Sequence, residues 1–371
     1  MQYRRGTAMR TSWLFFAVFS VLLWKLWDRV PLLPELGSFV GSLVIIFWVS
    51  YCLSGILWKK LFVKQLPVDG KAVLITGCDS GFGHALATRL SRDGFVVFAG
   101  CIDSQSDGAR VLGKQHNTTV LQMDITKADQ VDAAFERVQQ ALGSRALWSV
   151  VANAGVRNNG LLEWITMESI VKIFDVNVFG TLRVTKKFLP MLKKSKGRMI
   201  VVTSPFGHVT MPMGVPYCMT KYALVSMVDG LRRECKGKGV DFVNIEPIAY
   251  KTAITTNLGA QAETQPELQQ QSPEVVANFS VKEVRRWLDM PSQLYELISR
   301  DDVNEVVDQM VLAIGETYPK TRYISKFRLG GILYYGAAVL PTELADLAIG
   351  LGMRTLPFVS RILRTHAGKR E

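Results

Sequence analysis

Cysteine and histidine are scarce in this chain of 371 residues, and acidic residues are fewer than basic ones. The 5 cysteines include no Cys-x-x-Cys pair, and the 4 histidines are scattered, so neither a disulfide framework nor a metal site is indicated. Lys and Arg number 44 against 32 Asp and Glu, which gives a net charge of +12. The basic residues are dispersed without an aromatic-interleaved basic motif, which argues against nucleic-acid binding.

Two long apolar runs occupy the N-terminal part, at residues 13–27 and 38–58. The second carries no charge and is long enough to cross the hydrocarbon core of a bilayer, although a buried helix of a soluble protein is the alternative. The first is not followed by the small residues of a signal cleavage site. We therefore predict a retained hairpin of two membrane helices within an anchor of residues 1–65. Basic residues on both outer flanks favour a cytosolic location for the domain that follows.

From residue 66 to 326, short apolar strands alternate with amphipathic helices, which is typical of an α/β fold with a parallel sheet. A buried strand ends at Thr76 and is followed by Gly-x-x-x-Gly-x-Gly at the start of a helix. Glycines there let the backbone approach a pyrophosphate at the helix N-terminus. The candidate phosphate-binding residues are Thr76, Gly77, Ser80, Gly81 and Gly83.

Three further strand ends supply candidate dinucleotide contacts. The second strand ends at Cys101 with Asp103 just beyond it, and no Lys or Arg follows until Arg110. A 2′-phosphate would find no cation there, so we predict NAD in preference to NADP. Asp124 ends the next strand and is suited to an adenine edge. A later strand ends in Asn153, Ala154 and Gly155.

The segment from Ser204 to Lys221 suggests proton transfer. If the chain is helical from Tyr217 onward, Tyr217 and Lys221 lie on one helix face, since they are four residues apart. A nearby ammonium group favours the phenolate and lowers the pKa of a tyrosine. Tyr217 is therefore a candidate general acid or base, with Ser204 as a neighbouring hydroxyl.

These motifs, together with Asn177 in Asn-Val-Phe-Gly, occur in the order and spacing of the short-chain dehydrogenase/reductase family, which the chain resembles strongly over residues 67 to 260. The resemblance implies a Rossmann-type doubly wound parallel sheet, here with an N-terminal membrane helical hairpin. It implies that Asn177 supports Lys221 through a water relay, that Lys221 holds the nicotinamide ribose, and that Ser204 orients the substrate oxygen. It also places Pro247 and Thr252 near the nicotinamide. The family's glycine after this proline is replaced by Ile248, which leaves the position of Thr252 open.

Within the family, the chain resembles a membrane-associated subgroup that contains 17β-hydroxysteroid, retinol and D-3-hydroxybutyrate dehydrogenases. The leading hypothesis is an NAD-linked oxidoreductase that interconverts a lipophilic alcohol, a steroid or retinoid, and its carbonyl. D-3-hydroxybutyrate dehydrogenase and a catalytically silent NAD-binding scaffold are the alternatives. We expect the endoplasmic reticulum membrane as the location, with a mitochondrial membrane as the alternative, and the sequence leaves a homodimer open.

The C-terminal part contains an apolar segment and a basic tail. We expect helices around residues 281–288 and 303–314, in the region where the family carries its substrate lid. Residues 327–371 form either an apolar cap or a membrane-associated segment, followed by the tail.

Overall fold

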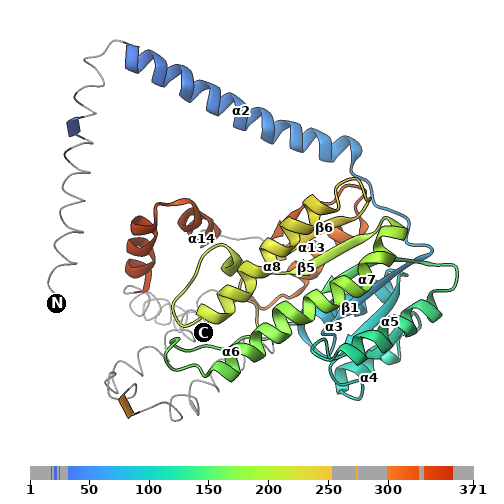
Figure 1. Cartoon of the computed structure of the whole chain (residues 1–371). Helices are drawn as coiled ribbons and strands as arrows, with labels where there is room; N and C mark the ends of the chain where they lie inside the picture. The colour runs from blue at the N-terminus through green and yellow to red at the C-terminus, as the bar shows by residue number, and fades with distance from the viewer. Residues whose placement is uncertain are drawn as a thin grey trace, which may run out of the picture. The chain divides into compact units, whose positions relative to one another are not determined.

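The computed structural model describes residues 18, 21, 22, 25, 32–252, 273–274, 299–325 and 330–353 (Figure 1). The chain divides into two compact units, residues 1–64 and residues 65–371. The predicted helix around residues 281–288 lies outside the described residues. So does most of the first predicted membrane run, of which four described residues are helical.

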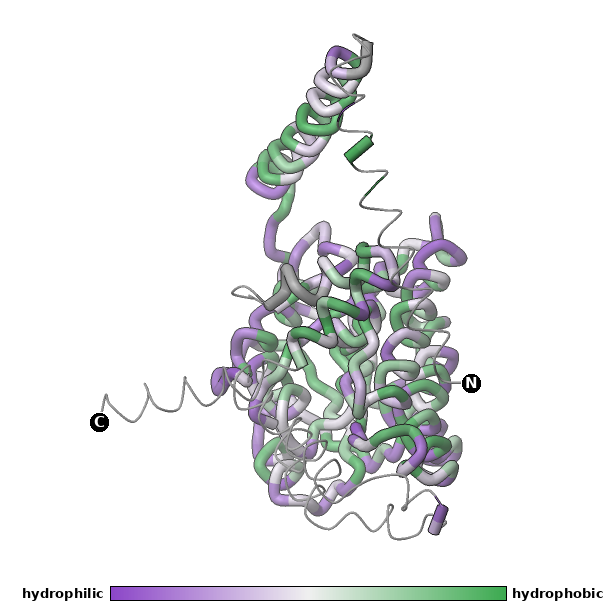
Figure 2. The backbone as a smooth tube through the Cα atoms, turned by 90° about the vertical axis from the view of Figure 1, so that its left-hand side faces the viewer, coloured by the Kyte–Doolittle hydropathy of each residue, from purple (hydrophilic) through white to green (hydrophobic). Residues whose placement is uncertain are grey.

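The first unit contains α2 (Leu32–Phe62), which is longer at both ends than the predicted run 38–58. Its 31 residues extend about 46 Å at 1.5 Å per residue, against a hydrocarbon core of about 30 Å. The stretch Pro34–Phe62 is long and apolar enough to cross a membrane (Figure 2). Its most apolar part is unburied. Lys59 and Lys60 lie in its last turn. The first helix of the predicted hairpin, at residues 13–27, stays a prediction.

The second unit is built on a parallel sheet of seven strands in the order β3-β2-β1-β4-β5-β6-β7. The strands are β1 (Lys71–Thr76), β2 (Val96–Cys101), β3 (Thr118–Gln122), β4 (Ala146–Ala152), β5 (Arg198–Val202), β6 (Asp241–Glu246) and β7 (Arg322–Ile324). The strand order reverses between β1 and β4, which makes their carboxyl ends the switch point where open α/β sheets bind ligands. The predicted α/β class and parallel sheet are confirmed.

Helices cover both faces of the sheet (Figure 1). One face packs against α3 (Gly81–Arg92), α4 (Asp107–Gly113) and α13 (Asn304–Gly315), and the other against α5 (Ala128–Leu142), α7 (Thr181–Ser195) and α8 (Val215–Glu234). Side chains alternate along β1, so that Val73 and Ile75 enter the first core while Ala72 and Leu74 enter the second. The remaining named elements are α6 (Met167–Phe174), η1 (Asp175–Gly180), η2 (Pro205–Gly207) and α14 (Gly330–Val339). The predicted helix around 303–314 is confirmed as α13.

The C-terminus of α13 is held by Arg198, the first residue of β5. Its side chain is 1% exposed, and its Nη1 donates to the carbonyl oxygens of Ala313 and Ile314 at 2.6 and 2.8 Å. These carbonyls have no partner within the helix, and a cation also matches the negative end of the helix dipole. Arg198 thus fixes α13 against the sheet from the edge opposite the ligand-binding one.

Candidate active site

The loop between β1 and α3 folds tightly on itself at two glycines. Gly77 has a φ of 69°, and a Cβ on it would lie 2.8 Å from the Cα of Ala154. A Cβ on Gly83 would lie 2.2 Å from the carbonyl oxygen of Gly77. Side chains are therefore excluded at both positions. Ser80 precedes the helix without a side-chain capping bond, so the first-turn amides from Gly81 onward fit a pyrophosphate, the anion that such helix ends bind.

Hydrogen bonds join the ends of β1 and β4 at the switch point. The Nδ2 of Asn153 donates to the carbonyl oxygens of Thr76 and Gly77 at 3.0 and 3.1 Å. In return, the Oγ1 of Thr76 accepts from the backbone amides of Asn153 and Ala154, both at 3.1 Å. Four of the predicted cofactor residues thus form one connected group, although they come from two strands far apart in the sequence.

The loop after β2 is tethered by a residue that the sequence reasoning missed. Asp79, within the glycine loop, accepts from the backbone amides of Ile102 and Asp103 at 3.0 and 3.1 Å. Cys101 is fully buried, and the carboxylate of Asp103 accepts from the amide of Gln105 at 2.8 Å. The signal for Asp79 was its place between the loop glycines, where a short carboxylate can reach backbone amides. Two carboxylates at this strand tip would repel a 2′-phosphate.

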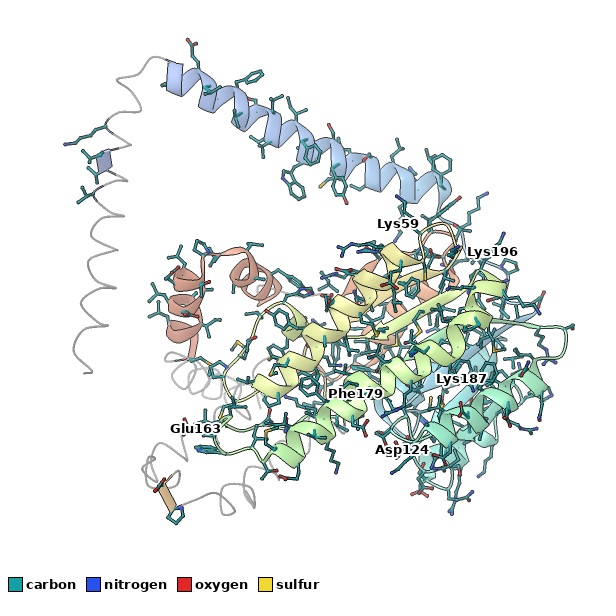
Figure 3. The ribbon with its side chains drawn as sticks, in the orientation of Figure 1. Lys59, Asp124, Glu163, Phe179, Lys187 and Lys196 are labelled. Atoms are coloured by element: carbon teal, nitrogen blue, oxygen red, sulfur yellow. The ribbon has the colours of Figure 1, made fainter. Side chains whose placement is uncertain are left out.

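Asp124 lies two residues beyond β3, at the same edge of the sheet (Figure 3). Its Oδ1 accepts from the backbone amide and the hydroxyl of Thr126 at 2.9 and 2.7 Å. The Asp124 amide donates to Gln130 at 2.8 Å. The carboxylate thus closes its own turn, and its role at an adenine stays a prediction.

Asn177 lies in the π-helical segment η1 and is 1% exposed. Its Oδ1 accepts from the amide of Val156 at 2.8 Å, and its Nδ2 donates to the Val156 carbonyl at 2.9 Å and to the hydroxyl of Thr220 at 3.1 Å. The Thr220 hydroxyl donates to the carbonyl oxygen of Tyr217 at 2.7 Å. A Cβ on Gly155 would lie 3.3 Å from Asn177 Oδ1. Asn177 therefore clamps the loop after β4 to helix α8.

Ser204, Tyr217 and Lys221 meet beyond the end of β5. Ser204 is 5% exposed, and its Oγ accepts from the amide of Phe206 at 3.3 Å. Tyr217 and Lys221 lie in the first turns of α8, where the Lys221 Nζ is 5.5 Å from the centre of the Tyr217 ring. The same ammonium donates to the carbonyl oxygen of Val202 at 3.0 Å. The structure thus brings the predicted hydroxyl, phenol and ammonium together.

Burial shifts both titratable groups of this cluster. It lowers the pKa of Lys221 to about 8, because a buried ammonium loses hydration. Burial also raises the pKa of Tyr217, while the charge of Arg157 and a hydrogen bond to Ser204 lower it. The Tyr217 phenol therefore stays protonated near neutral pH unless further positive charge favours the phenolate.

Arg157 is a second residue that the sequence reasoning missed. Its guanidinium carbon is 5.1 Å from the centre of the Tyr217 ring and 5.5 Å from that of Phe206. The two rings meet edge to face with centres 6.2 Å apart. A single arginine after Gly155 has no recognisable spacing to α8, so only the fold could place it here.

The exit of β6 returns the chain to the glycine loop. Glu246 ends the strand and is fully buried, and Pro247, which follows, is also buried. A Cβ on Gly81 would lie 3.7 Å from the side chain of Thr252. The predicted nicotinamide-loop residue therefore faces the start of α3, even though Ile248 stands where the family has glycine.

Glu246 is also the centre of a charged cluster. Its Oε1 is 3.1 Å from the Nε2 of His208 and 3.2 Å from the Nη1 of Arg322. The hydroxyl of Tyr335, in α14, donates to its Oε2. This cluster links β6, the segment after Ser204, β7 and α14.

Residues 71–263 match the family model described as short chain dehydrogenase. The chain is 39% identical to estradiol 17-beta-dehydrogenase 2 of Mus musculus over 93% of this chain and 90% of the relative. It is 36% identical to the mitochondrial D-beta-hydroxybutyrate dehydrogenase of Bos taurus, over 69% and 77%. It is 33% identical to retinol dehydrogenase 7 of Mus musculus, over 78% and 92%. The chain belongs to the short-chain dehydrogenase family.

A solved structure supports the fold. A short-chain dehydrogenase/reductase from Burkholderia phymatum in complex with NAD superposes with a TM-score of 0.61 at 20% identity, over 76% of this chain and 96% of that one. At this identity the similarity concerns the fold alone.

Proposed function

We propose that this protein is an NAD-linked oxidoreductase that interconverts a lipophilic alcohol, a steroid or retinoid, and its carbonyl. The observation that carries the proposal is the cluster of Ser204, Tyr217 and Lys221 at the carboxyl edge of the sheet, beside a glycine loop that excludes side chains. Relatives that are 39% and 33% identical to this chain over the aligned residues are named for estradiol and retinol.

Each residue of the cluster has a distinct role. Tyr217 takes the hydroxyl proton when the alcohol is oxidised and returns it in the reverse direction. Ser204, whose hydrogen bond lowers the pKa of Tyr217 against the effect of burial, orients the substrate oxygen. Lys221 presents its ammonium beside the Tyr217 ring, where it would bind the cofactor ribose. Asn177 keeps the loop after β4 on α8, and supports Lys221 through water.

The cofactor that we propose is NAD. When bound, it supplies the hydride acceptor of the oxidation. The glycine loop and the first turn of α3 would hold its pyrophosphate, since any Cβ at Gly77 or Gly83 would strike backbone atoms. Cys101, Asp103 and Asp124 would line the adenosine side, and Asn153 to Gly155, Pro247 and Thr252 the nicotinamide side. The carboxylates of Asp79 and Asp103 favour NAD over NADP, because they would repel a 2′-phosphate.

We propose a lipophilic substrate and a membrane location. The apolar, unburied α2 supports anchoring in a bilayer. An enzyme that draws its substrate from lipid binds it more tightly in an apolar pocket, because burial of apolar surface contributes about 25 cal/mol per Å². The exposed apolar side chains of the C-terminal helices, among them Val339 and Leu347, suit a cap or a contact with the membrane surface. We place the protein at the endoplasmic reticulum with a cytosolic catalytic unit. Glycosylation of Asn117 in microsomes would show the opposite orientation.

A panel of alcohols tests the proposal. The full-length protein in detergent is given estradiol, testosterone, retinol and D-3-hydroxybutyrate, each with NAD and with NADP, and NADH or NADPH formation is recorded. We expect the highest kcat/KM for a steroid or retinol with NAD. A higher value for hydroxybutyrate would favour the small-acid alternative, for which a 36% identical relative is named. Cofactor binding without turnover of any alcohol would favour a silent scaffold.

A further inference from the structure

We propose that Arg157 is a positioning residue that favours the phenolate of Tyr217 and so lets proton abstraction proceed at lower pH than Lys221 alone would allow. The proposal rests on the proposed function for its catalytic meaning, while the coupling between Arg157 and Tyr217 can be measured separately. It adds a residue to the proton-transfer cluster from a different element, the loop after β4.

The geometry places two cations next to one phenol ring. The guanidinium carbon of Arg157 is 5.1 Å from the ring centre of Tyr217, and the Nζ of Lys221 is 5.5 Å from it. Both distances lie within the ~6 Å over which a cation interacts with an aromatic ring. Arg157 also lies 5.5 Å from the ring of Phe206, which packs against Tyr217. The guanidinium therefore belongs to the wall of the site.

The loop that carries Arg157 is fixed at both ends. Asn177 bonds both the amide and the carbonyl of Val156, the residue before Arg157. The amide of Gly160 donates to the carbonyl oxygen of Met213 at 3.0 Å. Within the loop, the Nε of Arg157 donates to the Oδ1 of Asn159 at 2.9 Å. These bonds hold the planar guanidinium in place, so its field on Tyr217 is preorganised.

The charges around Tyr217 respond differently to pH. Burial lowers the pKa of Lys221 to about 8, so this ammonium loses its charge as the pH rises through that value. Burial raises the pKa of Cys218, which keeps the thiol neutral there. An arginine stays protonated at every pH at which proteins remain folded. Of these three groups, Arg157 alone keeps its positive charge both below and above pH 8.

A direct titration tests the coupling. The tyrosinate absorbance of the full-length protein is followed against pH in detergent, and the same curve for Tyr217→Phe is subtracted to isolate Tyr217. The measurement is repeated with Arg157→Gln and with Arg157→Lys, each paired with its own Tyr217→Phe variant. We expect the Tyr217 titration to move up by about one pH unit in Arg157→Gln, and by much less in Arg157→Lys, which keeps the charge.

Arg145→Gln is the matched control. Arg145 is exposed directly before β4, at the end of the strand opposite the loop that carries Arg157, and so lies roughly 20 Å away at ~3.3 Å per residue. The Arg145→Gln substitution removes the same charge and should leave the Tyr217 titration unchanged. The acidic limb of kcat/KM for alcohol oxidation, where activity rises as the phenolate forms, should shift with the titration. A Tyr217 titration that is the same in Arg157→Gln and in the parent protein overturns the proposal. If the titration shifts but no alcohol is oxidised, the proposed function fails and the coupling stands.

Discussion

Two polar networks lie next to the segment that begins at Ser204, and they differ in charge. The network of Asn177 is neutral, with an amide that bonds the backbone of Val156 and the hydroxyl of Thr220. The network of Glu246 is charged and joins His208, Arg322 and a tyrosine of α14. A neutral amide sets the position of its partners without adding a field. A buried carboxylate paired with an arginine holds distant elements together, but both charged groups must lose hydration.

This difference suggests a division of labour. The neutral network supports the reacting groups through α8 and the loop after β4, so damage to it should appear first in catalysis. The charged network secures β7 and α14 against the catalytic segment, so damage to it should appear first in stability. Substitutions of Tyr217 and Lys221 serve as references, the first for a loss of kcat and the second for a change in the free energy of unfolding.

The largest effect is expected for Tyr217→Phe, which removes the transferable proton. General acid-base groups supply 10²–10⁴-fold, so kcat should fall by about that factor while the dissociation constant for NADH and the thermal unfolding midpoint change little. Stopped-flow turnover and fluorescence titration of NADH measure the two quantities. Retention of more than about a tenth of the parent rate would mean that another group transfers the proton.

Lys221→Met should lose activity and gain stability at neutral pH. The pKa of Lys221 is lowered from 10.5 to about 8 in the folded protein, which corresponds to a burial cost of about 3 kcal/mol below pH 8. Loss of the bond to Val202 offsets about 1 kcal/mol of the gain.

The sign of the pH dependence follows from proton binding. Between pH 8 and 10.5 the unfolded chain holds a proton that the folded one has released, so the parent protein gains stability as the pH rises. The advantage of Lys221→Met should therefore disappear by about pH 10.5. Urea denaturation at pH 7, 8.5 and 10 measures this, and an advantage that grows with pH would contradict the assigned shift.

Glu246→Gln should lower the free energy of unfolding by about 2 kcal/mol. The substitution keeps the shape but leaves Arg322, which is 28% exposed, without its buried carboxylate, and this partial exposure reduces the ~3–5 kcal/mol typical of a broken buried pair. The expected kcat is within about twofold of the parent. A large loss of kcat with unchanged stability would reverse the contrast between the networks.

Asn177→Ala should lower the free energy of unfolding by about 1–2 kcal/mol, less than Glu246→Gln, since the backbone groups of Val156 lose their partner. Here kcat should fall about tenfold or more, because the loop with Arg157 and the turn with Tyr217 lose their common clamp. Comparing kcat with the unfolding free energy in this variant and in Glu246→Gln tests the division directly. Equal changes in both quantities for both variants would remove the distinction.

The sequence by itself determined the sheet and much of the site. Short continuous apolar runs predicted the strands, because a parallel strand buries both faces. The glycine spacing and the Tyr217–Lys221 spacing are local, since one loop and one helical turn set them. The helix at the predicted run 38–58 was also readable from its apolar, uncharged sequence, although α2 extends beyond both ends of that run.

Only the tertiary structure decided what lies across from these local motifs. Asp79 reaches the loop after β2, Arg157 stacks on a ring of α8, and Glu246 gathers partners from three other segments. None of these pairs has a fixed sequence separation, because each depends on which strand ends become neighbours at the switch point. The pKa of Lys221 was decided in the same way. A sequence displays the charge, but burial, which sets the cost of keeping that charge, exists only once the chain has folded.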